Sequence, residues 1–409
     1  MLSVFTPTHN PQYLQAAYDS LLAQTYDDWE WIILHNGEST ELLPFDDPRV
    51  HQHVATGNGV GWAKREAVSH CTGDILVELD HDDVLHEYAL QGIRHTFTMN
   101  QNAVFVYSDF EQINADGTPN ADRFDPAYGW QYDDNRCISF EPYPSAVSYI
   151  WYAPNHVRAF TREAYDAVGG YNENLTVLDD QDLMNRLYQH GQFVRIPETL
   201  YYQRVHSSQT QAQADLNAQI QHQTVVQYDR NAEANALAWA KRAGLACLDL
   251  GGAHNSPPGY QSVDLHEPAD LVGDVFEVLG GFEDDSVGVI RAHDFLEHIP
   301  DKVRLMNEIY RVLAHGGMLL SMTPSTDGRG AYQDPTHVAF WNENSFWYYT
   351  NQQFAKYVPE ITCRFQANRL DTIFPTLWHN QHQIPYVYAN LVAIKDGHNL
   401  PRLPGELNI

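Results

Sequence analysis

The chain has 409 residues, of which 43% are hydrophobic and 12% aromatic, enough for two domains with cores of their own. Its 53 acidic and 24 basic residues give a formal net charge of −29, which is poorly suited to binding nucleic-acid phosphates or an anionic membrane. The four cysteines form no Cys-x-x-Cys pair, the first residues lack a signal-peptide pattern, and no run reaches the roughly 20 apolar residues that span a bilayer. We expect a cytoplasmic protein with no nucleic-acid partner and no integral membrane segment, while its oligomeric state stays open.

The first half of the chain, residues 1–206, alternates short apolar runs with helical patterns. Strands are predicted at 2–5, 29–34 and 75–79, and apolar residues at helical spacing predict a helix over 11–24. Such alternation indicates an α/β sheet whose functional sites lie at the carboxyl ends of the strands.

Two acidic clusters dominate this half. Asp80-His81-Asp82-Asp83 directly follows the strand at 75–79, and the side chains of Asp80 and Asp82, at alternate positions, point the same way. Two carboxylates at a strand end suit a hard divalent cation. The second cluster, Asp179-Asp180-Gln181-Asp182-Leu183, offers a carboxylate that can act as a general base. Together they suggest metal-assisted transfer of a group that leaves a diphosphate.

Residues 2–206 resemble the inverting, family-2-type glycosyltransferases with the GT-A fold. The resemblance rests on motifs in the family's order, which here read Ser3-Val4-Phe5-Thr6-Pro7-Thr8-His9-Asn10, Gln24-Thr25-Tyr26, Trp29-Glu30-Trp31-Ile32-Ile33, Lys64-Arg65, Asp80-His81-Asp82, Gly169-Gly170-Tyr171, Asp179-Asp180-Gln181-Asp182-Leu183 and Tyr202-Gln203-Arg204-Val205-His206. The family's Asp-Asp/Asn-Gly-Ser turn, which holds the nucleotide base, reads His35-Asn36-Gly37-Glu38.

The resemblance implies a nucleotide-diphospho-sugar donor, a glycan acceptor and inversion at the anomeric carbon. It implies nucleotide contacts by Thr6, Asn36 and Arg65, and it places Asp80 by the ribose. Asp82 would bind Mn²⁺ or Mg²⁺ on the diphosphate.

The same resemblance makes Asp180 the general base, with Asp179 in place of the family's Glu and next in line for the role. The alternative for Asp180 is a helix N-cap, since Asp is favoured at a helix start. His206 would touch the metal or the diphosphate, and its alternative is a histidine on a surface loop.

Residues 207–243 are rich in Gln, Asn and Ala and read as a helical linker, after which a new α/β pattern occupies residues 244–409. This second half resembles the class I S-adenosylmethionine-dependent methyltransferases, which have a Rossmann-like fold. The matching motifs are Leu248-Asp249-Leu250-Gly251-Gly252, Gly259-Tyr260-Gln261-Ser262-Val263-Asp264-Leu265, Gly273-Asp274-Val275-Phe276, Ala292-His293-Asp294-Phe295-Leu296-Glu297-His298-Ile299, Arg311-Val312-Leu313-Ala314-His315-Gly316-Gly317 and Asp334-Pro335-Thr336-His337.

This second resemblance implies S-adenosylmethionine bound at the Gly251-Gly252 turn, where glycine lets the backbone approach a ligand closely. Asp264 would take the ribose hydroxyls, and Asp274 would lie near the adenine. The usual Gly-x-Gly-x-Gly loop continues here as Ala253-His254-Asn255. His298 and His337 are read either as ordinary polar packing or as a catalytic base.

The sequence therefore predicts a GT-A glycosyltransferase fused to a methyltransferase that O-methylates the same glycan. Three alternatives stay open: a methyltransferase whose first half only binds glycans, a glycosyltransferase with an inactive methyltransferase-like domain, and a non-catalytic assembly protein.

Overall fold

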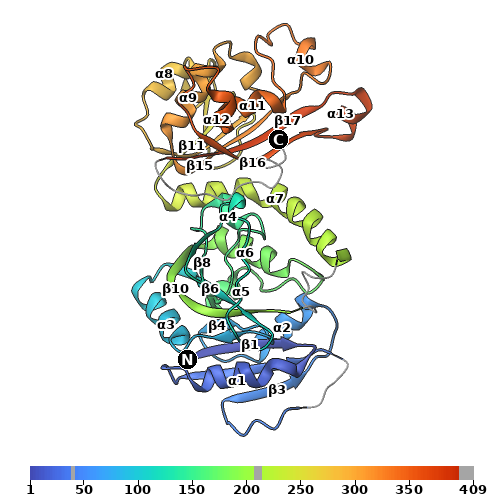
Figure 1. Cartoon of the computed structure of the whole chain (residues 1–409). Coiled ribbons are helices and arrows are strands. Elements are labelled where there is room, and N and C mark those ends of the chain that lie inside the picture. Colours follow the sequence, from blue (N-terminus) through green and yellow to red (C-terminus); the bar gives the residue numbers. More distant parts are fainter. Residues whose placement is uncertain (38–41, 207–213, 396–409) are drawn as a thin grey trace. The chain divides into compact units, whose positions relative to one another are not determined.

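The computed structural model describes residues 1–37, 42–206 and 214–395 (Figure 1). The chain divides into two compact units. Unit 1 comprises Met1–Pro126 and Trp130–Asn235, and unit 2 comprises Ala127–Gly129 and the chain from Ala236 onward. The division falls within the long helix α7 (Ala214–Arg242). Glu38 of the predicted base-binding turn and the first residues of the predicted linker lie outside the described residues.

Unit 1 is built on a ten-stranded mixed sheet in the order β3-β2-β1-β4-β9-β6-β10-β5, with β8 paired to β6 and β7 to β8. The strands are β1 (Leu2–Thr8), β2 (Trp29–His35), β3 (Val50–Val54), β4 (Ile75–Glu78), β5 (Val84–Leu85), β6 (Ala103–Asn114), β7 (Gln131–Asp133), β8 (Arg136–Ile138), β9 (Arg158–Thr161) and β10 (Gln192–Val205). Strands β1 to β4 are parallel, and β9 runs antiparallel to β4. The three predicted strands are confirmed, and the first continues to Thr8.

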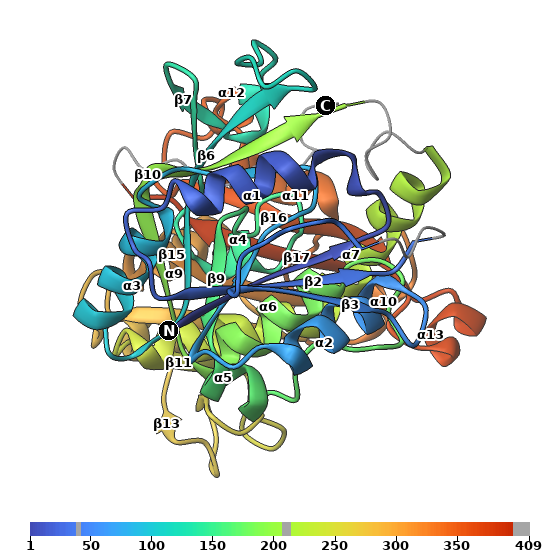
Figure 2. The ribbon, with the colours of Figure 1, turned by 90° about the horizontal axis from the view of Figure 1, so that it is seen from below.

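Helices cover both faces of this sheet. They are α1 (Leu14–Leu22), α2 (Val60–His70), α3 (Ala89–Met99), α4 (Pro144–Val147), α5 (Arg162–Ala167) and α6 (Asp179–His190). The predicted helix over 11–24 begins as a 3-10 turn, Pro11–Tyr13, in which the Gln12 N–H donates to the side-chain oxygen of Asn10. Figure 2 shows α1 and α2 on opposite sides of β1 and β2. Every residue of β2 is buried, as expected of a strand covered on both faces.

Unit 2 contains a seven-stranded sheet in the order β13-β12-β11-β14-β15-β17-β16. Its strands are β11 (Ala246–Leu250), β12 (Gln261–Asp264), β13 (Leu271–Val272), β14 (Val287–His293), β15 (Leu313–Pro324), β16 (Phe365–Ile373) and β17 (Tyr386–Ala393). Strand β17 runs antiparallel to both of its neighbours. The strand order reverses between β11 and β14, which is where doubly wound sheets bind ligands.

The helical elements of unit 2 are α8 (Val275–Gly280), η4 (Leu296–His298), α9 (Lys302–Val312), α10 (Gly330–Gln333), α11 (Glu343–Thr350), α12 (Gln352–Ala355) and α13 (Leu377–His382). Both units are α/β, which confirms the predicted GT-A and Rossmann-like fold classes. Within the described ranges, no helix combines the length and the apolar character needed to cross a membrane.

Candidate active site

The first acidic cluster lies at the carboxyl end of β4, in the loop that leads to β5. Two hydrogen bonds from Arg204 of β10 hold this loop. Its main-chain N–H donates to Asp83 Oδ1 at 2.6 Å, and its side-chain Nε donates to the Asp82 carbonyl oxygen at 2.7 Å. The loop is therefore fixed by strand β10, which ends at Val205, directly before His206.

Asp82 and His206 meet in this loop although 124 positions separate them. His206 Nε2 lies 2.8 Å from Asp82 Oδ2, and the two side chains are 12% and 15% exposed, respectively. The antiparallel pairing of β10 with β5 produces this approach, because it sets Tyr202 beside Val84. His206 is thus a mostly buried partner of a carboxylate rather than a surface-loop histidine. An imidazole nitrogen and a carboxylate oxygen at one point form a donor pair that fits a divalent cation.

A buried carboxylate, Glu78, forms the centre of a second cluster. Its side chain is 1% exposed and lies 2.6 Å from Lys64 Nζ of α2. Arg158 Nη1 of β9 and His156 Nε2 each lie 3.7 Å from Glu78 Oε2. His156 Nδ1 in turn lies 3.4 Å from Asp80 Oδ2.

The two basic partners of Glu78 extend the cluster to the start of α6. Lys64 Nζ lies 3.0 Å from Asp179 Oδ2, and Arg158 Nη1 donates to Asp180 Oδ2 at 2.8 Å. The Asp179 side chain is 5% exposed, whereas that of Asp180 is 21% exposed. Asp180 is therefore the member of this pair that is accessible from solvent. The helix cap is Leu178, in the left-handed region with φ of 57°, so Asp180 is not the N-cap.

The charges of this cluster set its protonation states. Burial would raise the pKa of Asp180, but the positive charges of Arg158 and Lys64 hold it below its usual value. Burial raises the pKa of Asp179 to about 6, although Lys64 opposes the shift. Burial, followed by the charges of Arg158 and Lys64, lowers the pKa of His156 well below its usual range. Asp180 is thus ionised and His156 neutral near pH 7.

The predicted nucleotide contacts in unit 1 have different surroundings. The Thr6 side chain is fully buried and its hydroxyl accepts a 2.9 Å hydrogen bond from Trp31 Nε1, so Thr6 belongs to the core and drops out of the site. Asn36 follows β2, and its N–H donates to the Thr8 carbonyl oxygen at 2.8 Å. Arg65 Nη1 donates to the carbonyl oxygens of Gly169 and Tyr171, both at 2.7 Å. Contacts of Asn36 and Arg65 with a nucleotide stay predictions.

Four site residues escaped the sequence reasoning: Lys64, Glu78, His156 and Arg158. All are buried. Glu78 interrupts the apolar run 75–79, and buried charged side chains are rare unless they are paired. A charged residue within this apolar run was therefore the signal in the sequence for a buried, paired carboxylate.

In unit 2 the predicted cofactor residues gather at the carboxyl ends of β11 and β12. These strands pair in parallel with Leu250 beside Val263, so Gly251 and Asp264 follow at adjacent strand ends. Gly251 has φ of +78°, a conformation that favours glycine. Asp274 caps α8 by accepting a 2.9 Å hydrogen bond from the Phe276 N–H.

A polar chain runs beneath the Gly251-Gly252 turn. Asp249 is fully buried and accepts a 2.9 Å hydrogen bond from Arg291, whose Nη2 lies 2.8 Å from His293 Nδ1. A Cβ on Gly252 would overlap the Asp249 carboxylate, so this position requires glycine.

Comparison with known proteins matches each half separately. Residues 3–169 match the model for glycosyl transferase family 2, and residues 210–321 match a methyltransferase domain. The chondroitin synthase of Pasteurella multocida (strain Pm70) is 27% identical over 217 residues, which are 51% of this chain and 21% of that protein. The chondroitin synthase of Escherichia coli is 26% identical over 217 residues, 51% of this chain and 30% of that protein. The chain thus spans well under half the length of these curated relatives.

Among solved structures, S. aureus TarS 1-349 in complex with UDP-GlcNAc superposes with a TM-score of 0.42 at 14% identity, covering 59% of this chain and 71% of that one.

Proposed function

We propose that this chain, in which a glycosyl transferase family 2 region precedes a methyltransferase domain, is an inverting, metal-dependent glycosyltransferase with a second unit that transfers methyl groups. The donor is a nucleotide-diphospho-sugar and the acceptor is a glycan hydroxyl. The observation that carries the proposal is the 2.8 Å contact between Arg158 and the partly exposed Asp180, which joins this carboxylate to the network centred on Glu78, two residues before Asp80.

Asp180 is the proposed general base. An acceptor hydroxyl is a weak nucleophile, so its proton must leave as its oxygen attacks the anomeric carbon. Asp180 is ionised near pH 7 and its orientation is fixed by Arg158, so it is ready to receive that proton at a carboxylate oxygen. The sugar gains oxocarbenium character as its bond to the diphosphate breaks. A single displacement with one base inverts the anomeric carbon.

Asp82 and His206 are the proposed ligands of Mn²⁺ or Mg²⁺. The two donor atoms lie 2.8 Å apart on side chains that are mostly buried, so little reorganisation is needed to present both to one ion. When bound, the ion acts as a Lewis acid on the leaving diphosphate. Asp80, Asn36 and Arg65 complete the proposed donor site.

The acceptor class is inferred from the relatives. Both proteins compared above carry the name chondroitin synthase, which denotes an enzyme that builds a polysaccharide. A growing glycan is therefore the acceptor that we propose.

The second unit is proposed to bind S-adenosylmethionine through Gly251, Gly252, Asp264 and Asp274 and to methylate a hydroxyl of the same glycan. One observation favours the alternative of a unit without cofactor. The Phe295 ring lies against Gly251, where even a Cβ would come within 3.0 Å of Cδ2. S-adenosylmethionine can therefore approach Gly251 only if the Phe295 ring moves aside.

The test is transfer of radiolabelled sugar from a panel of nucleotide-diphospho-sugars, with and without Mn²⁺, to oligosaccharide acceptors. Metal-dependent transfer with an inverted anomeric configuration, read by NMR of the product, is expected. Transfer that persists in EDTA, or that retains the configuration, contradicts the proposal. Labelled S-adenosylmethionine supplied with the same product tests the methyl transfer.

A further inference from the structure

We propose that unit 2 carries a site for a divalent transition-metal ion, formed by Glu297, His298 and His337. Each of the three residues offers one ligand atom, and these atoms all lie within 4.8 Å of one another. His298 and Glu297 belong to η4, which follows β14, and His337 comes from the loop after α10.

The strongest evidence is the state of the Glu297 carboxylate. The residue is 2% exposed, and its Oε2 accepts a 2.7 Å hydrogen bond from Thr323 Oγ1 of β15. Its Oε1 is buried and has no hydrogen-bond partner within the described residues. A buried charged oxygen without a partner is costly. Ordinary polar packing would have given this oxygen a hydrogen-bond donor, which is missing. A bound cation would compensate the charge of the oxygen in its place.

His337 presents a nitrogen to this oxygen. Its Nδ1 lies 3.1 Å from the Ala331 carbonyl oxygen, which can only accept, so Nδ1 carries the proton and Nε2 keeps its lone pair. Nε2 lies 4.0 Å from Glu297 Oε1, which is too far for a hydrogen bond. Two ligands of one tetrahedral zinc ion lie about 3.3 Å apart, given bonds of about 2.0–2.1 Å. Closing the gap between these two atoms takes less than about 1 Å. Because all three ligand atoms lie within 4.8 Å of one another, no pair has to close by more than about 1.5 Å.

His298 is oriented in the same way. Its Nδ1 lies 3.3 Å from the Thr336 carbonyl oxygen and 3.2 Å from the Thr336 hydroxyl. The two imidazole rings have centroids 5.1 Å apart. Histidines that bind metals usually donate their other ring N–H to a carbonyl or carboxylate, and here both rings have such a partner.

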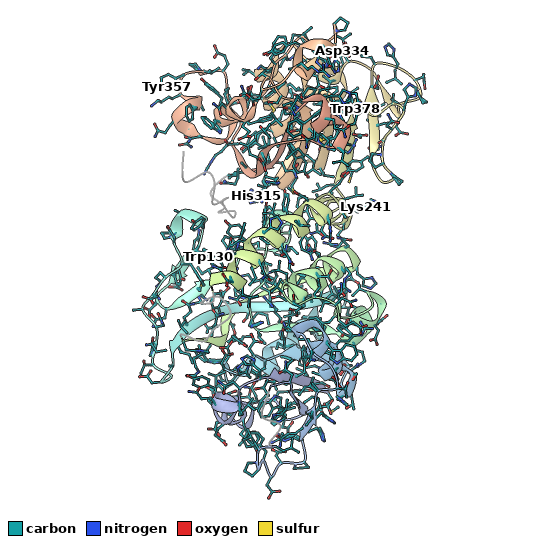
Figure 3. The ribbon with its side chains drawn as sticks, turned by 90° about the vertical axis from the view of Figure 1, so that its right-hand side faces the viewer. Trp130, Lys241, His315, Asp334, Tyr357 and Trp378 are labelled. Carbon is teal, nitrogen blue, oxygen red and sulfur yellow. The ribbon has the colours of Figure 1, made fainter. Side chains whose placement is uncertain are left out.

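The segment that carries His337 is locked onto η4. The N–H groups of Val338 and Ala339 both donate to the Glu297 carbonyl oxygen at 2.9 Å. Asp334, labelled in Figure 3, accepts a 2.8 Å hydrogen bond from the Thr336 N–H and so forms the turn before His337. The donor atoms are therefore positioned before any ion arrives. The Asp334-Pro335-Thr336-His337 motif forms the turn that places His337 beside η4.

Two imidazoles and one carboxylate select the class of ion. This donor set suits Zn²⁺ and other first-row divalent ions better than Mg²⁺ or Ca²⁺, and three protein ligands leave a coordination position open. The site follows β14 and touches the end of β15, strands that run parallel to β11, so it shares the sheet edge with Gly251. We infer that the open position holds the oxygen to be methylated, and this last step alone rests on the proposed methyl transfer.

Cobalt is the probe for the experiment, because its visible absorption reports imidazole and carboxylate ligation. The full chain is stripped with a chelator and titrated with Co²⁺, and then Zn²⁺ is added as a competitor. We expect ligand-field bands that zinc abolishes. Both His337→Ala and the milder His298→Asn should weaken the cobalt affinity at least tenfold, since loss of an outer partner alone typically costs 10–100-fold.

Two variants separate this site from other histidines and from unit 1. His382→Ala removes an exposed histidine of α13 and should leave the bands unchanged. His95→Ala removes an exposed histidine of α3 in unit 1 and should likewise leave the bands unchanged. Thermal unfolding of each variant verifies the fold. The metal site is refuted if folded His298→Asn and His337→Ala keep the wild-type spectrum and affinity, or if the wild type gives no bands. A chain that binds cobalt but transfers no methyl group keeps the site and loses only the acceptor role.

Discussion

Arg158 donates a hydrogen bond of 2.8 Å from Nη1 to Oδ2 of Asp180, and the guanidinium also lies 3.7 Å from Glu78. The proposed base, Asp180, thus shares the Arg158 guanidinium with Glu78. Glu78 ends β4, the strand that leads to the proposed metal ligand Asp82. The contact lowers the pKa of Asp180 and fixes its orientation, so the base is defined by strand β9 as much as by its own helix.

Replacing Asp180 by Asn should lower turnover at least a hundredfold with little loss of donor binding, since general base catalysis contributes roughly 10²–10⁴. Sugar transfer at saturating donor is the measurement. Asp182→Asn is the matched control, because Asp182 lies in the same helical turn but pairs with Arg186. Near-normal transfer by Asp180→Asn would move the base role to Asp179.

Asp82→Ala should abolish the metal-dependent part of UDP binding, since it removes one of the two donors that lie 2.8 Å apart. Calorimetry with UDP, with and without Mn²⁺, provides the measurement. Asp166→Ala, an exposed acid of α5, is the control. Unchanged metal-dependent affinity in a folded Asp82→Ala protein would show that the ion binds elsewhere.

Glu78→Gln should reduce the free energy of unfolding by about 3 kcal/mol, because removing one member of a buried ion cluster leaves the others uncompensated. Here Lys64 and Arg158 lose a partner whose side chain is 1% exposed. Urea unfolding compared with Glu87→Gln, an exposed residue, is the measurement. The Glu78→Leu/Lys64→Met double variant should be less destabilised than the sum of its single changes. Strict additivity would mean that the pair does not interact.

Asp264→Ala should weaken binding of S-adenosylhomocysteine at least tenfold, because two charge-assisted hydrogen bonds to the ribose, each worth about 1.5–3 kcal/mol, would be lost. Titration of the full chain, with the exposed Glu283→Ala as control, measures it. Equal affinity in both variants contradicts the assignment, and no binding by the wild type would mean that unit 2 is structural.

Acid should destabilise unit 2 through His293. Burial, followed by the charge of Arg291, lowers the pKa of this imidazole to about 4, and its Nδ1 serves as acceptor to the Arg291 guanidinium. Because the usual value is about 6.5, the unfolded chain binds the proton more readily. The contribution is fully present above pH 6.5 and is lost as the pH falls toward 4.

Between pH 7 and pH 5 this group should cost on the order of 2 kcal/mol of unfolding free energy. His293→Asn keeps an acceptor without the titration, so its stability should fall less over that interval. Parallel pH dependence of wild type and variant in urea unfolding would assign the acid sensitivity to other groups.

The sequence predicted the strands at 2–5, 29–34 and 75–79 because short, mostly apolar runs alternate there with helical patterns. It predicted the Asp82 and Asp180 clusters because acids at a strand end and a helix start are conspicuous. The proximity of His206 to Asp82 followed only from the family's order of motifs. The two residues are 124 positions apart, and the pairing of β5 with β10 brings them together.

Helical and strand periodicity carry two further signals about unit 1. Ala63, Lys64, Ala67 and Val68 form one buried stripe of α2, so helical spacing would have pointed Lys64 inward and Arg65 outward. Thr6 shares a face of β1 with Leu2 and Val4, and strand alternation would have buried it. The left-handed Leu178 that displaces Asp180 from the cap was not predicted, because residues other than glycine rarely adopt positive φ.

The grip of Arg65 on the carbonyl oxygens of Gly169 and Tyr171 has a consequence for engineering. Gly169 and Gly170 both have positive φ, so the shape of the segment from Gly169 to Tyr171 depends on two glycines and on one arginine more than a hundred positions earlier. A chimera that imports a relative's segment at Gly169–Tyr171 must import the residue at position 65 with it. This segment therefore cannot be exchanged independently of helix α2.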